Sequence, residues 1–457
     1  MGIREVSKCA LLAVMIARPL PALDLAASKQ GVPERRGNSW QQILSFEAPA
    51  REGARLLVRA AGGAVSVRPG PVDKVSCNVI LRAYTSDEAK ARRLFDSFQL
   101  STRLVDAGGV YITSQSPQRD RRGANFHIQF QIAVPQRYNL DIETQGGDIS
   151  VEAPLEGEAR LTTAGGDVRV TGLAGPGRIE TAGGSITLGS IGGDLTARTA
   201  GGAIHTSDVK GDAVLETSGG EIVTGAVTGT LKAETAGGDV VVGGASGQVQ
   251  ARTAGGQIQI GPTGGSVRAE TAGGSIRLQS ARGHVVAETA GGSIDLLKVE
   301  SAVRASTAAG RILAEFNCTK KSFGPSMLES SMGDVYVYLP VDVPLTIDAA
   351  IDAAAGRSIR SDFPLDIQGD KDELVPTTIR GHGALNGGGE VLKIRTVSGN
   401  IEIRKIDSAS LRDLQQREDS TWKAWQDRRA EKDRRNQETE KQRRQRQKEG
   451  DEDDHDQ

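Results

Sequence analysis

The chain has 457 residues, a formal net charge of −2, 57 glycines and only 4% aromatic residues. A charge so close to zero gives no basic field, so nucleic acid and anionic membranes are not expected as partners. The low aromatic content excludes a large conventional core and leaves a thin one of Val, Ile, Leu, Ala and Thr. Length alone would predict two to four domains, but an internal repeat predicts one long domain instead.

Residues 1–27 are predicted to be a secretory signal peptide. Arg4 and Lys8 supply positive charge, an apolar run extends from Cys9 to Ala17, and small residues follow at Ala22, Ala26 and Ala27. The run is too short to span a bilayer, the residues before Cys9 do not suit a lipid anchor, and no later segment is a transmembrane candidate. The pattern predicts export to the periplasm or the cell surface. A cytoplasmic leader is the alternative.

Residues 28–45 are expected to be a polar linker, and residues 46–142 an N-terminal β-rich cap. Strand-like alternation of apolar and polar residues is clear in the cap, although it lacks a regular period. A helix is expected at 86–98, with Ser86 as its N-cap. Cys77 in this region and Cys318 could form one disulfide bridge, but two buried thiols are an equally good interpretation.

The sequence Thr-Ala-Gly-Gly, or a close copy of it, returns every 18 residues between 143 and 313. Its threonines are Thr163, Thr181, Thr199, Thr217, Thr235, Thr253, Thr271, Thr289 and Thr307, and a degenerate copy starts at Thr144. A fixed period of this size indicates one small structural unit stacked on itself.

Each unit divides into two nine-residue halves, as in GTLKAETAG and GDVVVGGAS from Gly229 onward. Both halves alternate apolar and polar residues and then reach glycine, which predicts two short strands and two turns. The expected fold is therefore an all-β parallel solenoid, or β-helix, of about ten coils. We expect the double glycines at its corners, where φ is often positive and side chains would clash. One inward column would be Ile186, Ile204, Ile222, Val240, Ile258, Ile276 and Ile294, and the other Ile179, Leu195, Ala213, Leu231, Val249, Val267 and Val285.

The repeated threonines are expected inside or at the corner, where each hydroxyl could bond to the backbone or to the next threonine. The neighbouring outward column reads Thr162, Glu180, Arg198, Glu216, Glu234, Arg252, Glu270, Glu288 and Ser306. It predicts a ladder of ion pairs, each worth little when exposed. Glu216 beside Glu234, and Glu270 beside Glu288, should weaken that ladder through like-charge contacts.

The period breaks after 313. Residues 314–406 still have the pattern of strands and are predicted to be a C-terminal β cap, in which SGNIEI at 398–403 is one more copy of the turn and strand. Residues 407–457 are a charged tail, with 13 Lys and Arg against 9 Asp and Glu between 411 and 449. This composition predicts a solvated helix or a disordered tail. A docking helix or a short coiled coil around Trp422 and Trp425 is the alternative.

No catalytic, cofactor-binding or metal-binding residue is predicted. The residues that follow the double glycines do not form a cluster of acids; they are Asp167, Ser185, Ala203, Glu221, Asp239, Gln257, Ser275 and Ser293. The turns also lack the regular Asp of calcium-binding glycine repeats. The histidines are too scattered for a zinc site or a triad; they are His127, His205, His284, His382 and His455. Gly387–Gly389 lacks the Lys and Ser or Thr of a phosphate loop and is interpreted as a turn.

The sequence resembles the bacterial putative-adhesin family of envelope β-strand-repeat proteins, a domain of unknown function. The resemblance covers roughly 46–406. It is carried by the Thr-x-Gly-Gly repeats from 144 to 310, QIAVP at 131–135, LDIETQGGDISV at 140–151, YLPVDVPLTIDAAI at 338–351, SDFPL at 361–365 and GGGEVLKIRTVSGNIEI at 387–403. It implies an adhesin-like β-solenoid and brings no catalytic residues. The charged tail departs from the family pattern.

These observations predict a non-enzymatic, exported β-solenoid that binds or scaffolds at the cell envelope through repeated polar columns. Its partner would be an envelope polymer, a surface or a protein, and a homo-oligomer is compatible with the pattern. Three alternatives stay open: a self-assembling filament similar to bactofilins, a polysaccharide-active β-helix enzyme, and an envelope-stress accessory that docks through its tail.

Overall fold

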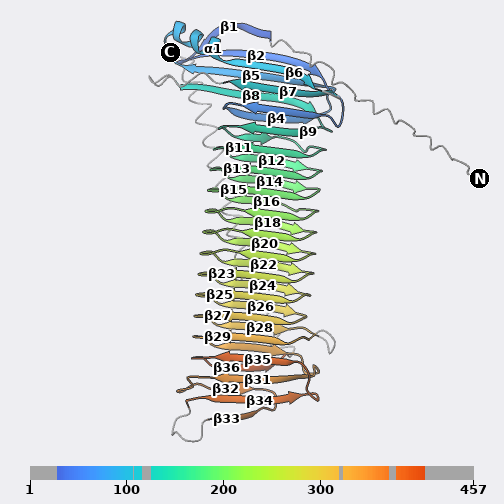
Figure 1. Cartoon of the computed structure of the whole chain (residues 1–457), viewed down its shortest axis with the longest axis vertical. Helices are drawn as coiled ribbons and strands as arrows, with labels where there is room; N and C mark the ends of the chain where they lie inside the picture. Colours follow the sequence, from blue (N-terminus) through green and yellow to red (C-terminus); the bar gives the residue numbers. More distant parts are fainter. Residues whose placement is uncertain (1–27, 106–107, 116–124, 319–322, 370–376, 407–457) are drawn as a thin grey trace, which may run out of the picture.

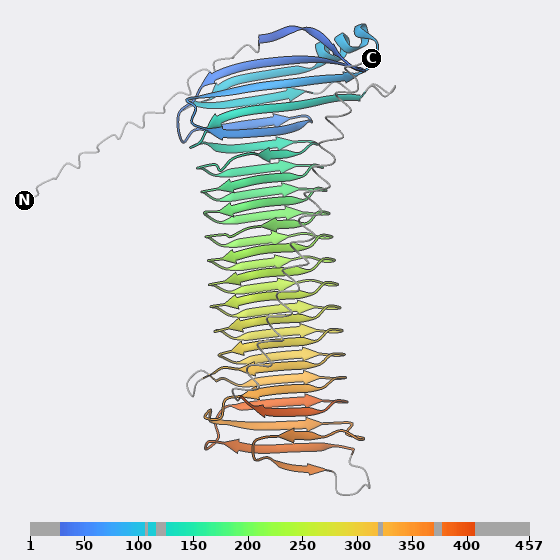
Figure 2. The ribbon, with the colours of Figure 1, turned by 180° about the vertical axis from the view of Figure 1, so that it is seen from behind.

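The structure is a computed structural model of the chain, and it describes residues 28–105, 108–115, 125–318, 323–369 and 377–406. Within these ranges the chain is a β-solenoid whose coils stack along one long axis, with the strands perpendicular to it (Figures 1 and 2). The predicted signal peptide and the charged tail lie outside the described residues.

Each coil of the repeat region contributes one strand to each of two parallel sheets. Sheet A contains β9 (Asn139–Thr144), β11 (Ala159–Thr163), β13 (Gly177–Thr181), β15 (Leu195–Thr199), β17 (Ala213–Glu216), β19 (Leu231–Glu234), β21 (Val249–Arg252), β23 (Val267–Thr271), β25 (Val285–Thr289) and β27 (Val303–Thr307). Sheet B contains β10 (Ile149–Val151), β12 (Val168–Leu173), β14 (Ile186–Ile191), β16 (Ile204–Thr206), β18 (Ile222–Val227), β20 (Val240–Ala245), β22 (Ile258–Thr263), β24 (Ile276–Ala281), β26 (Ile294–Val299) and β28 (Ile312–Phe316). Equivalent residues of successive coils pair in register, as Thr181 does with Thr199.

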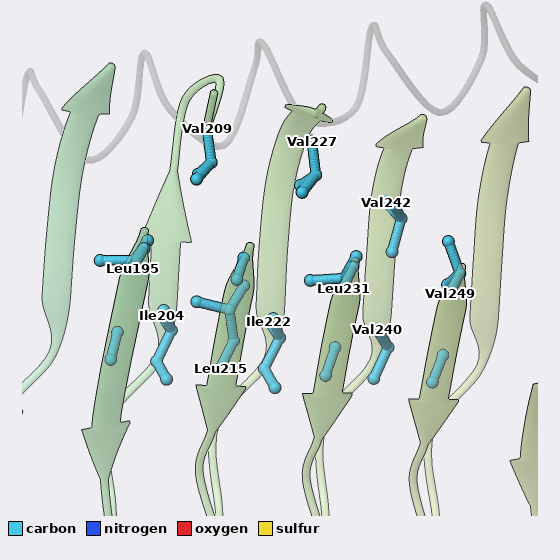
Figure 3. Close-up of a cluster of buried hydrophobic side chains, with 14 of the residues drawn as sticks. Leu195, Ile204, Val209, Leu215, Ile222, Val227, Leu231, Val240, Val242 and Val249 are labelled. Carbon is cyan, nitrogen blue, oxygen red and sulfur yellow. The ribbon is translucent and has the colours of Figure 1, made fainter. Parts of the chain in front are cut away.

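The core is a narrow aliphatic layer between the two sheets (Figure 3). The predicted column from Ile186 to Ile294 is confirmed, because each of its residues is at most 1% exposed. The second predicted column is also buried, but its first member was misaligned. Gly177 occupies the position of Leu195, whereas Ile179 pairs with Ala197.

The corner after each sheet A strand explains the repeated sequence. The Thr181 hydroxyl donates to the carbonyl oxygen of Gly166 in the preceding coil at 2.8 Å, and it accepts from the amide of Gly184 at 3.2 Å. The same pair of bonds recurs at Thr199, Thr217, Thr235, Thr253, Thr271 and Thr289. The prediction of a buried threonine bonded to backbone is therefore confirmed; its acceptor is a glycine carbonyl rather than the next threonine.

The second glycine of each corner is required by the neighbouring coil. A Cβ at Gly184 would lie 2.0 Å from the carbonyl oxygen of Gly166, whereas a Cβ at Gly183 would meet its nearest atom at 3.8 Å. The prediction of positive φ at these corners is wrong for the 18-residue coils. Gly147 at the first corner has φ +111°, but the described repeat glycines after it have no positive φ. Close stacking therefore selects glycine here.

The N-terminal cap contains the first coil of the stack, made by β3 (Arg55–Ala60) and β4 (Ala64–Gly70). This coil pairs in parallel with β9 and β10, and the carbonyl of Gly63 accepts from the Thr144 hydroxyl at 3.2 Å. The segment AAGGAV at 60–65 is thus a copy of the corner that the sequence analysis missed, because alanine replaces its threonine.

The rest of the cap closes this end of the stack. Antiparallel strands β1 (Ser28–Arg36), β2 (Ser39–Pro49), β5 (Lys74–Tyr84) and β8 (Asn125–Pro135) extend sheet B, and β6 (Gln99–Val105) and β7 (Gly109–Gln115) extend sheet A. Residues 28–45, expected to be a linker, instead form β1 and part of β2. Helix α1 (Glu88–Ser97) packs against β5 and β2. Its N-cap is Asp87 rather than Ser86, because Asp87 accepts from the amides of Ala89 and Lys90.

The C-terminal cap stacks its strands out of chain order. It contains β29 (Ser326–Ser330), β30 (Val335–Leu339), β31 (Leu345–Ile351), β32 (Ile359–Ser361), β33 (Asp366–Gly369), β34 (Ile379–Leu385), β35 (Val391–Thr396) and β36 (Ile401–Lys405). The last coil, β35 and β36, lies between the coil of β29 and β30 and the coil of β31 and β32. The predicted repeat copy at 398–403 is confirmed, since the Thr396 hydroxyl donates to the carbonyl oxygen of Gly333 at 3.0 Å.

Candidate functional site

The solenoid offers two long outer surfaces, one on each sheet. We call the outward side chains of β11 to β27 face A. They form two columns: Thr162, Glu180, Arg198, Glu216, Glu234, Arg252, Glu270, Glu288 and Ser306, and beside it Arg160, Arg178, Thr196, Val214, Lys232, Gln250, Arg268, Val286 and Arg304. The first column was predicted from the sequence. The second was missed, although it lies two residues earlier on each strand.

Ion pairs connect face A along the stack. An unbroken series runs from Arg198 through Glu216, Lys232, Glu234, Arg252 and Glu270 to Arg268. Further pairs join Arg178 to Glu180 at 2.7 Å and Arg304 to Glu288 at 3.9 Å. The predicted ladder is therefore present, and consecutive rungs are one coil apart, about 4.8 Å.

The like-charge contact expected between Glu216 and Glu234 is relieved by Lys232. Its ammonium group lies 2.9 Å from a carboxylate oxygen of each glutamate. The hydrogen bond from Lys232 lowers the pKa of Glu216 below its ordinary value, and the same bond raises the pKa of Lys232 above its own. Among the described residues, Glu270 and Glu288 are not bridged by one cation; each instead has its own, since Arg268 pairs with Glu270 and Arg304 with Glu288. Face A is thus mostly polar, and most of its charged side chains are paired with one another.

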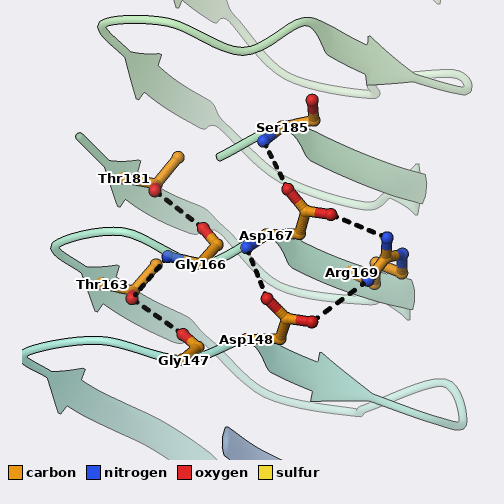
Figure 4. Close-up of polar contacts among 8 residues, drawn as sticks. All are labelled: Gly147, Asp148, Thr163, Gly166, Asp167, Arg169, Thr181 and Ser185. Carbon is orange, nitrogen blue, oxygen red and sulfur yellow. Dashed lines mark hydrogen bonds and ion pairs between the residues drawn. The ribbon is translucent and has the colours of Figure 1, made fainter. Parts of the chain in front are cut away.

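Acidic residues at the corners bond to the next coil. The carboxylate of Asp148 accepts from the amide of Asp167 at 2.9 Å, and that of Asp167 accepts from the amide of Ser185 at 2.8 Å (Figure 4). Arg169 pairs with both carboxylates, at 3.8 and 2.8 Å. Elsewhere in the stack Asp194, Asp208, Asp212 and Asp239 accept from the following coil in the same way. These carboxylates hold coils together, each through one of its two oxygens.

The described histidines and carboxylates do not converge on a reaction centre. His205 lies 3.1 Å from Glu221 in the next coil, whereas His127, His284 and His382 belong to β8, the turn before β25 and β34. Within the described ranges no group of three or more His, Cys, Asp or Glu is arranged to hold a metal ion. Gly387 and Gly388 have φ values of +91° and +77° between β34 and β35, which agrees with the predicted turn.

The two described cysteines are buried free thiols. Cys77 is 1% exposed and Cys318 is 4% exposed. Burial raises the pKa of the Cys77 thiol far above its ordinary range, and burial likewise raises the pKa of Cys318 to about 11. Of the two interpretations left open by the sequence, the structure supports two separate thiols, which contribute to packing rather than to a reactive site.

We call the outward side chains of sheet B face B. The composition of face B changes along the rod. Its first column reads Arg169, Thr187, His205, Val223, Val241, Gln259, Arg277, Asp295, Leu313, Tyr336 and Glu402. Two residues further along β26, Leu297 also points outward. The carboxylate of Asp295 forms ion pairs with two arginines, Arg277 at 3.4 Å and Arg311 at 3.2 Å. Face B therefore mixes apolar and charged positions, and its outward valines Val223 and Val241 stand in adjacent coils, whereas those of face A, Val214 and Val286, lie four coils apart.

Comparison with known families supports the fold and the sequence resemblance. Residues 106–282 match the family described as Toastrack DUF4097. The match covers less than half of the chain. The Toastrack match ends at Arg282, between β24 and β25, although the stack continues in the same register through β27 and β29. The resemblance to a domain of unknown function in adhesin-like proteins is confirmed.

Two solved structures are similar to the chain. One is described as a putative adhesin from Bacteroides fragilis; it is 15% identical with a TM-score of 0.27, and the similarity covers 56% of this chain and 97% of that one. The other is described as a putative cell adhesion protein from Clostridium sporogenes; it is 8% identical with a TM-score of 0.16, covering 80% and 99%. No curated protein matches the sequence.

Among the residues that the structure places, no helix has both the length and the apolar composition of a membrane span. The helix α1 has 10 residues, fewer than the roughly 20 that a bilayer requires.

Proposed function

We propose that this chain is an exported, non-enzymatic binding or scaffold protein of the cell envelope, and that face A is its contact surface. The observation that carries the proposal is the continuous ion-pair ladder of face A. From Arg198 to Glu270 it fixes at least one charged group in every coil, at a spacing of about 4.8 Å. Adhesion, the role in the descriptions of the two solved structures, is one form that such binding would take.

A regular surface of paired charges suits an extended polar polymer better than a small molecule. Each rung would contribute a weak contact, since exposed charged groups give little energy individually. A polymer that follows the rod would engage many rungs at once, so the contacts would reinforce one another through effective concentration. A stiff rod supports this because the rungs cannot move apart.

The ends of the stack favour a discrete rod over a filament. Sheet B begins with the antiparallel strands β1 and β2, and sheet A ends with the antiparallel strands β34 and β33. A parallel coil of another copy could not continue the repeat in register on such ends, and capping of this kind limits edge-to-edge association.

Binding can be tested by co-sedimentation of residues 28–457 with isolated cell-wall polysaccharide. The test variant combines Arg198→Gln with Glu216→Gln and Arg252→Gln with Glu270→Gln, which breaks the ladder without changing net charge. The control combines Arg68→Gln with Glu152→Gln, an exposed pair at 2.6 Å on sheet B. We expect binding to fall for the face A variant alone. Equal binding by all three proteins would contradict the role of face A, and release of reducing ends would reveal an enzyme.

Export is tested separately by fractionating cells and sequencing the N-terminus of the mature chain. Cleavage near residue 27 and recovery from the envelope would support the proposal. An intact N-terminus on a cytoplasmic, fibrous protein would favour the filament alternative.

A further inference from the structure

Face B contains apolar side chains that point away from the core and are nevertheless buried. Val223, Val241 and Leu297 are 6%, 5% and 7% exposed. Thr187 and Arg169, in the same column nearer the N-terminal cap, are exposed. An outward residue on an open sheet keeps much of its surface in water, so the buried ones indicate a cover over this part of face B.

The helix and strands that the structure describes do not supply this cover. Within the described ranges the single helix is α1, and it packs against β5 and β2 at the N-terminal cap. We infer that the cover is the C-terminal segment of the same chain, with a helix that begins at residue 408, continues past Trp425 and packs along face B from β28 to β18.

The described chain ends where such a helix would have to start. Strand β36 belongs to sheet B and pairs with β30, and the amide of Ile406 donates to the carbonyl oxygen of Leu339 at 3.0 Å. The 51 residues that follow, 407–457, leave from the sheet whose outer surface is face B. They are long enough, at about 1.5 Å per residue in a helix, to follow the whole rod.

The apolar residues of this segment share one side of a helix. They are Leu411, Leu414, Trp422 and Trp425. Counted from Leu411 they occupy positions i, i+3, i+11 and i+14, which lie on one stripe of an α-helix. Glu418, at i+7, lies on the same stripe between the two apolar pairs.

The two leucines and Trp425 of this stripe fall within about 2 Å of apolar positions on face B, whereas Trp422 falls level with β22. Measured from Ile406, Leu411 and Leu414 lie about 8 and 12 Å along a helix, and Trp422 and Trp425 about 24 and 29 Å. From β36 the order of strands is β30, β28, β26, β24, β22, β20 and β18. At about 4.8 Å per strand, Leu313 on β28 and Leu297 on β26 lie at about 10 and 14 Å, and Val241 on β20 and Val223 on β18 at about 29 and 34 Å.

The one acidic residue of the stripe also has a complementary position. Glu418 lies about 18 Å from Ile406 along the helix, and Arg277 on β24 lies about 19 Å from β36. A helix in this place would bring the leucines against Leu313 and Leu297, Trp425 against Val241, and a carboxylate beside Arg277. Charge and hydrophobic pattern therefore agree on one register.

The inference can be tested by the fluorescence of the two tail tryptophans in residues 28–457. The chain has three tryptophans, so Trp40→Phe leaves Trp422 and Trp425 as the only emitters. We expect blue-shifted emission with weak acrylamide quenching. Val223→Glu with Val241→Glu should red-shift the emission and raise the quenching constant toward that of the unfolded chain. The control, Val214→Glu with Val286→Glu, places the same change on face A and should leave both unchanged.

A cross-link provides a second measurement that does not depend on the charged variants folding. Val241→Cys with Trp425→Cys should form a disulfide within one chain under mild oxidation, whereas Val214→Cys with Trp425→Cys should not. Exposed tryptophans in the parent protein, together with no cross-link, would overturn the inference. Cross-linking between chains, or tryptophan burial that depends on protein concentration, would also overturn it, because the cover would then be a second copy.

Discussion

The hydroxyl of Thr181 donates a 2.8 Å hydrogen bond to the carbonyl oxygen of Gly166, which lies in the preceding coil. The bond links two coils and also fixes the corner, since the same hydroxyl accepts from the Gly184 amide. Because the unit recurs at each Thr-Ala-Gly-Gly corner, its energy adds along the rod. Thr181→Val keeps the shape and leaves the buried carbonyl and amide without this partner. We expect a loss of about 1–2 kcal/mol, measured as a lower urea midpoint, while Thr181→Ser should retain most of the stability.

The same substitution should have the opposite effect at Thr224. This side chain is fully buried, and its hydroxyl has no hydrogen-bond partner in the described part of the chain. Its equivalent in the next coil is Val242. Thr224→Val removes an unsatisfied polar atom and keeps the volume, so we expect stabilisation of about 1 kcal/mol. A lower urea midpoint would show that the hydroxyl is satisfied in solution.

The two glycines of one corner should tolerate alanine very differently. At Gly184 the new Cβ would lie 2.0 Å from a backbone oxygen, and at Gly183 it would make an ordinary contact at 3.8 Å. We expect Gly184→Ala to cost about 3 kcal/mol, in the upper range for overpacking. Gly183→Ala, the matched control, should change stability by less than about 0.5 kcal/mol. Similar thermal midpoints for the two variants would contradict the stacking argument.

The face A ladder should contribute a small, pH-dependent stability through Lys232. Because the pKa of Glu216 is lowered in the folded chain, the contribution is present above the ordinary glutamate pKa and is lost as the pH falls through the lowered value. Because the pKa of Lys232 is raised, the contribution persists below its ordinary 10.5 and is lost only as the pH rises through the raised value. Lys232→Met should therefore cost at most about 1 kcal/mol near neutral pH.

Urea unfolding at several pH values checks this prediction. The difference between parent and Lys232→Met should be flat between about pH 6 and 9, shrink below about pH 4, and shrink in high salt. Gln250→Met, in the same column, should show no such dependence. A difference that grows on acidification would contradict the assignment of Lys232 to the ladder.

Both described thiols should be unreactive in the folded protein. Cys318 has a pKa of about 11, so only about 1 in 1,000 of its side chains is a thiolate at pH 8, and Cys77 is less ionised still. We expect residues 28–457 to react with Ellman's reagent only after unfolding, when two thiols should appear. Rapid reaction of the native chain, or fewer than two thiols after unfolding, would mean that the burial or the free state is wrong.

The repeat made most of the solenoid predictable, because an 18-residue period fixes which residues share a column. The inward isoleucines, the threonine corners and the Arg198 and Glu216 ladder all follow from that alternation. The coil at 60–65 and the coil around Ser330 were missed, since alanine and serine replace threonine there. The position of β35 and β36 could not be predicted either, because it depends on contacts between residues 66 apart, such as Asp334 and Asn400.

The candidate surface was less predictable than the fold. The sequence showed one column of face A, but the role of Lys232 needed the position of its side chain between two strands. The buried valines of face B could not be recognised from alternation alone, since an isolated outward valine is common on any sheet. These valines can be recognised as unusual only when the structure shows both that their side chains point away from the core and that they have little exposed surface.

The place of β35 and β36 also determines when the rod can be completed. Residues 391–405 are the last described strands along the chain, yet they separate two coils made earlier. Until that stretch has left the ribosome or the translocation channel, β31 can pair only with β34, and β32 lacks its partner β36, so this coil cannot join the stack. A premature stop codon before residue 391 would therefore leave the far end of the molecule unclosed even though most of its length had been made.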